Sequence, residues 1–426
     1  MVAAQTTTEG STTSSPAAPP KRVAALIAVL GALTAVAPLS TDMYVPGFPE
    51  MGSSLHASVS AVQLSMTAFL AGAVLGQILI GPLSDGLGRR RLLIPGTAAF
   101  AALSFLCAVA PNVQILIGAR FLEGVAGAVG MVLARAVITD WFRGADIPRY
   151  FSMLSMVLGI APVAAPVLGG AILSVSTWRA TFFVLTAAGV LLLLAVLAKV
   201  PESLPSARRR AVGLGSTFRA MGGLLGRRTF VGYVLTLGFA TAALFTYISG
   251  SSFVFENIYG VSATQYSLIF AVNALGMLLS GGAFGVLARR LRMNTLLSLG
   301  VSIAAAGVIG QVVFIATVGA GLTGTWCCLF VALAGIGMVF PASMSLGQTL
   351  GRHAPGTASA LLGGTQFLLG ALASPLVGLF GTSSATPMAA VMLGALACAA
   401  LSLILLARPW QGHGEFRESP HTVAAA

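Results

Sequence analysis

Five ionisable side chains stand inside long apolar stretches of this 426-residue sequence: Asp42, Arg120, Glu123, Arg135 and Asp140. A charged group inside hydrocarbon is costly, so such residues mark ion or substrate pathways by default. Asp42 could do the most direct chemistry, because a carboxyl partly removed from water can gain and lose a proton near neutral pH. The alternative is that its helix ends early and Asp42 only solvates the exit.

Arg120 and Glu123 are three residues apart and therefore share one face of a helix. Either they form a buried ion pair that holds the helix in place, or Glu123 is a second proton site whose affinity Arg120 tunes. Pairing satisfies both charges at the least cost, which favours the structural role. We expect Arg135 to extend toward the cytoplasmic surface or to pair with Asp140.

Familiar catalytic constellations are missing from the sequence. A Walker A loop needs Gly directly before Lys, but the only lysines, Lys21 and Lys199, follow Pro and Ala. The four histidines lie in predicted loops or tails, and the four cysteines lie in apolar runs without CxxC spacing. We therefore expect no enzyme, no metal site and no cofactor.

The composition indicates a membrane protein. Apolar residues make up 57% of the chain and charged residues only 8%, whereas a soluble domain carries about 25% charged residues. Since one bilayer crossing needs about 20 apolar residues, the apolar content suffices for roughly twelve crossings. The predicted class is an all-α polytopic membrane protein.

Apolar runs divide the chain into two sets of six helices. The first set is predicted near 23–47, 59–82, 92–110, 114–140, 150–174 and 179–200, and the second near 230–255, 264–288, 294–316, 325–350, 357–380 and 386–407. This pattern predicts two six-helix bundles at 23–200 and 230–407, a cytoplasmic linker at 201–229, and cytoplasmic tails at 1–22 and 408–426, the first of them disordered.

The charge distribution predicts the orientation in the membrane. With the N-terminus inside, 20 of the 23 Lys and Arg residues fall on the cytoplasmic side. The net charge of +12 is thus a topology signal and gives no reason to expect a nucleic-acid partner. Both termini are expected in the cytoplasm.

Two short stretches combine small and charged residues in specific spacings. The stretch 81–91 is predicted to be a short cytoplasmic gating loop that forms charge pairs and caps a helix end, through Gly81, Asp85, Gly88, Arg89 and Arg90. On the fifth helix, small residues and prolines predict close packing and a hinge, at Pro162, Pro166, Gly169 and Gly170. The glycines at 124, 127 and 130 predict close packing of the fourth helix.

A central cavity of such a protein should be mostly apolar with few polar anchors. The candidate substrate-binding residues are Tyr44, Gln63, Tyr247, Asn273 and Gln366. For each of them singly, a hydrogen bond between helices is the alternative.

Several of these stretches resemble a known family. The stretch 81–91 is similar to the signature between helices two and three of the major facilitator superfamily. The segment Ser40–Pro46 (STDMYVP) resembles the hallmark of the Bcr/CflA drug-resistance transporters, and so do 120–135, 165–170 and 247–255. That family consists of twelve-helix drug/proton antiporters, including exporters of bicyclomycin and chloramphenicol.

The resemblance implies a proton-coupled exporter of small amphipathic drugs in the bacterial cell membrane, with Asp42 as the protonatable carboxylate and Arg120 linked to proton coupling. Its expected partners are the drug, protons and the lipid bilayer, and we expect it to work as a monomer. Gly86, Glu123 and Ala165 depart from the family pattern. The matching loop of the second half (285–290) lacks the acid, so gating is expected to be asymmetric.

Two other functions stay open at this stage. The same fold serves proton-coupled or facilitative transport of a small metabolite, since fold alone does not fix direction or substrate. A membrane receptor is a rival of a different class, although the short tails disfavour it.

Overall fold

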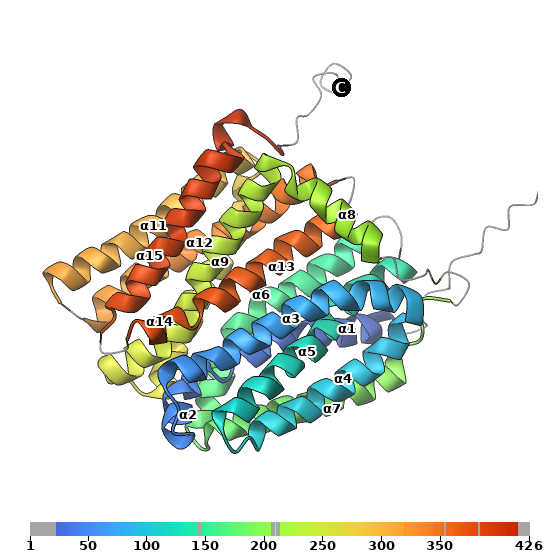
Figure 1. Ribbon diagram of the computed structural model, residues 1–426, viewed down its shortest axis with the longest axis horizontal. Coiled ribbons are helices and arrows are strands. Elements are labelled where there is room, and N and C mark those ends of the chain that lie inside the picture. Colours follow the sequence, from blue (N-terminus) through green and yellow to red (C-terminus); the bar gives the residue numbers. More distant parts are fainter. Residues whose placement is uncertain are drawn as a thin grey trace, which may run out of the picture.

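The computed structural model is helical throughout its described part, with two halves lying side by side (Figure 1). Twelve described helices are long and apolar enough to cross a membrane, which confirms the predicted class and the number of crossings. The predicted tail 1–22 lies outside the described residues. The structure describes residues 23–142, 146–205, 209, 214–319, 321–352, 355–381 and 384–415.

The first half contains the six predicted spans and one additional short helix, α2. Its helices are α1 (Val23–Asp42), α2 (Phe48–Ser54), α3 (Val59–Leu87), α4 (Arg89–Ala108), α5 (Val113–Trp141), α6 (Asp146–Leu173) and α7 (Trp178–Lys199). The side chains of Ser58 and Asn112 cap α3 and α5 by accepting backbone N–H bonds.

The second half repeats the six spans after a helix in the linker. Its elements are α8 (Leu214–Leu225), α9 (Arg228–Ser252) with the π-helix η3 (Phe253–Ile258), α10 (Ala263–Leu287), α11 (Met293–Thr317), α12 (Leu322–Leu350), α13 (Pro355–Ala373), α14 (Leu376–Leu379), and α15 (Thr386–Leu401) with η4 (Ser402–Ala407) and η5 (Pro409–Gln411). The helix α8 within 201–229 was not foreseen from the sequence.

The prediction of a loop across 81–91 is wrong. Helix α3 continues to Leu87 and α4 begins at Arg89, so Gly88 alone separates them. Gly88 has a φ of +105°, a conformation open to glycine but costly for other residues. Helix α3 continues through Gly81, Pro82 and Gly86, and the helical backbone is interrupted only at Gly88.

Close approach of α3 and α5 depends on glycine. A Cβ on Gly72 would collide with the carbonyl of Phe121, and a Cβ on Gly124 would collide with the carbonyl of Phe69. Such reciprocal contacts between small residues are how membrane helices pack without a hydrophobic driving force. Arg120 and Glu123 lie on α5 directly beside this contact, so their helix is held firmly against α3.

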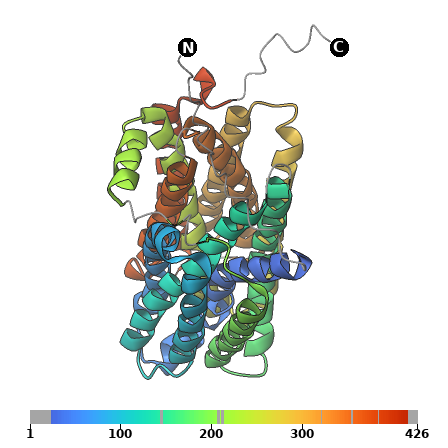
Figure 2. The ribbon, with the colours of Figure 1, turned by 90° about the vertical axis from the view of Figure 1, so that its right-hand side faces the viewer.

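The two halves meet mainly through α6 with α10 and α3 with α13. We call the end of the molecule that carries α2 and α14 the α2 end, and the opposite end the α8 end. Figure 2 views the molecule from the α8 end and shows the blue-to-green first half beside the yellow-to-red second half.

Among the described residues, three hydrogen bonds join the halves, and all three lie at the α2 end. Gln63 Nε2 donates to the carbonyl of Ser249 (3.0 Å) and Gln63 Oε1 accepts from the amide of Gly378 (2.9 Å). Thr67 Oγ1 donates to the carbonyl of Ala371 (2.9 Å). The rings of Phe48 and Phe253 add an apolar contact with centroids 6.1 Å apart. The α2 end is therefore closed by contacts between the halves.

Candidate functional site

Asp42 is the last residue of α1, and its side chain is buried rather than solvated. Only 4% of the residue is exposed, and its Oδ1 has no hydrogen-bond partner among the described residues. Helix α1 does end there, as the alternative interpretation expected, but the chain turns through η1 (Val45–Gly47) and α2 and encloses the carboxyl. An unpaired buried carboxylate is costly, so a proton on Asp42 stabilises this arrangement.

Polar residues of the second half lie near Asp42. The chain just after Asp42, η1, packs against α9, which carries Tyr247, and against α10, which carries Tyr266. Tyr247 Oη accepts a hydrogen bond from Asn273 Nδ2 (2.9 Å), and Asn273 Oδ1 accepts one from Trp326 Nε1 (3.1 Å). A chain of hydrogen bonds thus runs from α12 through α10 to α9, opposite the carboxyl on α1.

Arg120 and Glu123 form a fully buried ion pair. Arg120 Nη1 lies 2.7 Å from Glu123 Oε2, and neither side chain is exposed. Ser104 Oγ donates to Glu123 Oε1 (2.7 Å) and Cys107 Sγ lies 3.5 Å from Oε2. Both carboxylate oxygens of Glu123 are therefore satisfied, in contrast to Asp42.

Arg120 also connects α5 to the end of α1. Its Nη2 donates to the carbonyl of Ser40 (2.9 Å), one of the last four carbonyls of α1, which have no partner within the helix. A cation at a helix C-terminus is favourable. The guanidinium also stacks over the rings of Phe69 (4.2 Å) and Tyr44 (4.6 Å). Arg120 thereby fixes the helix end two residues before Asp42.

The five candidate substrate residues fall in different places. Tyr247 and Asn273 lie in the hydrogen-bond chain near Asp42, and Tyr44 is buried with its hydroxyl 3.1 Å from Ser65 Oγ. Gln63 bridges the halves at the α2 end, and Gln366 is half-buried on α13 without a hydrogen bond among the described residues. Tyr247, Asn273 and Gln63 make hydrogen bonds between helices, which was the alternative for each, and Tyr44 joins the turn after α1 to α3.

The residues of the predicted hinge lie at close contacts. A Cβ on Gly169 would collide with the backbone of Met43, and one on Gly170 would collide with Ser267 of α10. Pro162 and Pro166 lie inside α6. Helix α6 therefore touches both α10 of the second half and the chain just after Asp42.

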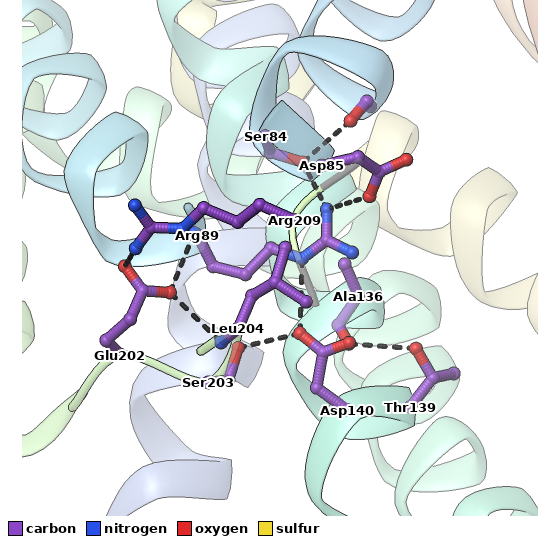
Figure 3. Close-up of polar contacts among 11 residues, drawn as sticks. Ser84, Asp85, Arg89, Ala136, Thr139, Asp140, Glu202, Ser203, Leu204 and Arg209 are labelled. Carbon is purple, nitrogen blue, oxygen red and sulfur yellow. Dashed lines mark hydrogen bonds and ion pairs between the residues drawn. The ribbon is translucent and has the colours of Figure 1, made fainter. Parts of the chain in front are cut away.

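Charged residues form a second cluster at the α8 end, centred on Arg89 (Figure 3). Arg89 Nη1 lies 2.6 Å from Asp85 Oδ1 and also bonds Ser84 Oγ, while its Nε lies 3.1 Å from Asp140 Oδ2. Ser203 Oγ donates to the same oxygen of Asp140 (2.7 Å). Of the two alternatives for Arg135, the pair with Asp140 is absent among the described residues, because Asp140 faces Arg89 on α4. Arg135 lies on an exposed side of α5.

Glu202, which follows α7, belongs to this cluster and was missed by sequence reasoning. Its Oε1 accepts from the amides of Arg89 (2.9 Å) and Leu204 (3.1 Å), and its Oε2 lies 3.8 Å from Arg209 Nη2. It thus caps the N-terminus of α4, where a carboxylate is favourable. In the sequence, the available signal for this cap was an acidic residue just after the apolar run of α7, together with the basic first turn of α4. Arg90, also predicted here, donates to the carbonyl of Leu197 (2.9 Å).

The second half has a counterpart of this cap. Helix α11 holds the same place in its half as α4, and Glu415 Oε1 accepts from the backbone amide (3.2 Å) and Nδ2 (3.0 Å) of Asn294 in its first turn. Arg292 lies 4.0 Å from Glu415. The loop at 285–290 lacks an acid, but the segment after the last helix supplies one, so the two halves differ less than the sequence suggested.

Two halves of six membrane-spanning helices, with a buried carboxylate between them and charge clusters at one end, define a polytopic membrane transporter. The chain belongs to the Major Facilitator Superfamily, whose sequence profile matches residues 30–375. This result confirms the family expected from the motifs.

Relatives with drug-resistance names support the narrower resemblance. The chain is 27% identical to a bicyclomycin resistance protein homolog of Haemophilus influenzae, covering 89% of this chain and 94% of the relative. It is also 27% identical to the multidrug resistance protein MdtL of Escherichia coli O157:H7, over 90% and 96% of the two chains. A higher identity, 39% over 86% and 92%, relates it to the uncharacterized MFS-type transporter YdgK of Bacillus subtilis.

Solved structures share the fold at low sequence identity. A bacterial homolog of the human lysosomal transporter Spinster, inward-facing and unoccupied, matches with a TM-score of 0.73 and 18% identity over 95% of this chain and 100% of that chain. The xylose transporter XylE of E. coli, in a partially occluded inward-open conformation, has a TM-score of 0.73 and 14% identity over 94% and 100%.

Proposed function

We propose that this protein is a drug/proton antiporter. It exports small amphipathic compounds, such as chloramphenicol- or bicyclomycin-like antibiotics, from a bacterial cell by alternating access of its two halves. The names of the relatives from H. influenzae and E. coli support the substrate class.

One observation supports the proton coupling: the carboxyl of Asp42 is buried, and its Oδ1 has no hydrogen-bond partner among the described residues. When Asp42 is neutral, the halves can close over it at low cost, whereas the ionised form needs water or a partner. Binding of the drug and binding of a proton to Asp42 then compete, so that the carrier holds one or the other. Arg120 supports the cycle by holding the end of α1 in place.

The cycle follows from this competition. On the cytoplasmic side the proton leaves Asp42 and the drug binds near Tyr247 and Asn273. On the outer side the drug leaves, Asp42 takes up a proton, and the carrier returns. The inward proton gradient drives export, and the membrane potential contributes about 2.3 kcal/mol per charge for each 100 mV.

In this proposal the α8 end faces the cytoplasm, together with both termini. The distribution of basic residues supports that orientation. Arginines occur in the first turns of α4 and α9 and in the chain around 289–292, and all three places lie at the α8 end. At the α2 end, the only basic side chains among the described residues are Arg179 and His56. The Arg89 cluster then acts as a cytoplasmic gating element of the bundle 23–200.

The decisive test compares Asp42→Asn with Asp42→Glu by measuring drug uptake into inverted membrane vesicles, driven by an imposed pH gradient. We expect Asp42→Asn to be made and inserted normally but to lose pH-driven drug transport, and Asp42→Glu to retain part of it because it can still bind a proton. A protonophore should abolish transport by the unaltered protein. Undiminished proton-driven transport by Asp42→Asn would overturn the proposal.

A further inference from the structure

A second carboxyl lies where the halves meet, on the opposite half from Asp42. Glu256 belongs to η3, the π-helical end of α9. This segment packs against α2 of the first half and against α10, next to the contact between Phe48 and Phe253. Any separation of the halves at the α2 end therefore changes the surroundings of Glu256.

In this closed arrangement, one oxygen of the Glu256 carboxyl is buried without a partner among the described residues. The residue is half-buried, and its Oε1 is buried without a hydrogen-bond partner in the described part of the chain. An ionised carboxylate enclosed in this way is destabilising unless a donor or a cation faces it.

Within the described residues of α2, α9 and α10, which pack around Glu256, no cation faces its carboxyl. Helix α2 contributes Glu50, whose Oε2 accepts from the amide of Trp178 (3.1 Å). Helix α10 contributes Tyr266, whose hydroxyl lies 2.8 Å from Ser251 Oγ on α9. The remaining titratable groups nearby are Tyr247, already bonded to Asn273, and Tyr259, whose hydroxyl lies 2.7 Å from Thr325 Oγ1.

The two basic side chains of the α2 end are engaged or exposed elsewhere. Arg179 Nη1 donates to the carbonyls of Ala108 (2.8 Å) and Ala110 (2.9 Å). His56 is exposed in the turn after α2. Neither compensates the charge of Glu256, so a proton is the remaining way to neutralise it.

We propose that Glu256 is a second proton-binding site, which takes up a proton from water when the α2 end closes and returns it when that end opens. The proton binds a carboxylate oxygen and goes back to the same side, so it is not itself transported. Acidity on the α2 side thereby favours closure. This deepens the proposed function, on which it rests, by adding a proton-dependent step to the return of the empty carrier.

The test follows the opening of the α2 end instead of transport. Spin labels at the exposed residues Ser53 on α2 and Thr264 on α10 report the separation of the halves in the purified full-length protein in lipid nanodiscs. Cys327, Cys328 and Cys398 are first replaced by serine, while buried Cys107 is kept. The distance distribution is measured at pH values on both sides of neutrality.

We expect the unaltered protein to open at alkaline pH and to close at acidic pH. Glu256→Gln should stay closed and lose most of this pH dependence, because its side chain is always neutral. Glu256→Asp should keep a pH-dependent opening, and Glu50→Gln should match the unaltered protein because its amide oxygen still accepts from Trp178.

Equal pH dependence in Glu256→Gln and the unaltered protein would overturn the inference and leave the Asp42 transport result untouched. Conversely, Asp42→Asn should retain the part of the opening that depends on Glu256. Loss of pH dependence in Glu256→Gln, together with undiminished transport by Asp42→Asn, would support the second site and reject the role of Asp42.

Discussion

The ionisable side chains inside the membrane-spanning helices differ in whether a partner of opposite charge compensates them. Arg120 and Glu123 compensate each other at 2.7 Å, and Ser104 and the carbonyl of Ser40 add further hydrogen bonds. Arg120 Nε alone has no partner among the described residues. Asp42 has no ion pair among the described residues, and its Oδ1 has no hydrogen-bond partner there. A group that must change its protonation state during a cycle cannot be tied to a permanent cation, since the cation would hold it ionised. This contrast favours a stabilising role for the pair and supports our proposal that Asp42 exchanges the proton.

At the residue scale, removing one member of the buried pair should be strongly destabilising. Arg120→Ala leaves the Glu123 charge uncompensated and frees the end of α1, which should cost about 3–5 kcal/mol of stability. Thermal unfolding in detergent measures this loss. The double variant Arg120→Ala/Glu123→Ala should recover part of it, because no unpaired charge remains. Equal stability of the Arg120→Ala single variant and the unaltered protein would contradict the prediction.

The variant Glu123→Gln separates the two roles considered for Glu123. Its amide oxygen can still accept from Arg120 or Ser104, so we expect the protein to fold and to keep the proton-to-drug ratio of the unaltered protein. The ratio is measured in proteoliposomes by balancing a drug gradient against a pH gradient. A lower ratio would show that Glu123 itself exchanges a proton.

At the element scale, a glutamate caps the N-terminus of the third membrane-spanning helix in each half. Glu202 caps α4 and Glu415 caps α11, each from the segment that follows the sixth helix of its half. The short connection at Gly88 leaves no room for a capping side chain of its own: a Cβ there would lie 2.7 Å from Glu202 Oε2. Each carboxylate thus ties the end of one half to its middle.

The variants Glu202→Ala and Glu415→Ala are matched controls for each other. Each should cost about 0.5–2 kcal/mol, the usual loss for a helix cap. Hydrogen exchange should accelerate at the amides of Arg89 and Leu204 in the first variant and at Asn294 in the second. Acceleration at both helices in either variant would mean that the caps do not act locally.

At the scale of the whole molecule, closure of the α2 end depends on few polar contacts. In the part of the chain that the structure describes, Gln63 makes two of the three hydrogen bonds between the halves and Thr67 makes the third. Alternating access requires that such contacts be weak enough to break in each cycle. A small set of single hydrogen bonds around an apolar contact meets that requirement.

Gln63→Ala should therefore shift the molecule toward opening at the α2 end. Each lost bond contributes about 0.5–1.5 kcal/mol, so Gln63→Ala should have roughly twice the effect of Thr67→Val. The spin labels at Ser53 and Thr264 report the change at constant pH. If Thr67→Val opens the α2 end as far as Gln63→Ala does, the bridge through Gln63 is not the main contact.

The sequence by itself determined the membrane class, the twelve spans and the unusual character of Asp42, Arg120 and Glu123. These depend on local properties: the length of apolar runs, the absence of charge within them, and the spacing of residues on one helix. The pair at positions 120 and 123 is local for the same reason and could be expected before the fold was known.

Only the tertiary structure decided which distant groups meet. Arg89 pairs with Asp140, 51 residues away, and its amide meets Glu202, 113 residues away. Arg120 reaches the carbonyl of Ser40 across 80 residues. Such partners depend on how helices are packed and rotated against one another, and hydrophobic runs carry no information about that rotation. For the same reason, the closed α2 end and the uncompensated Glu256 became visible only when both halves were placed together.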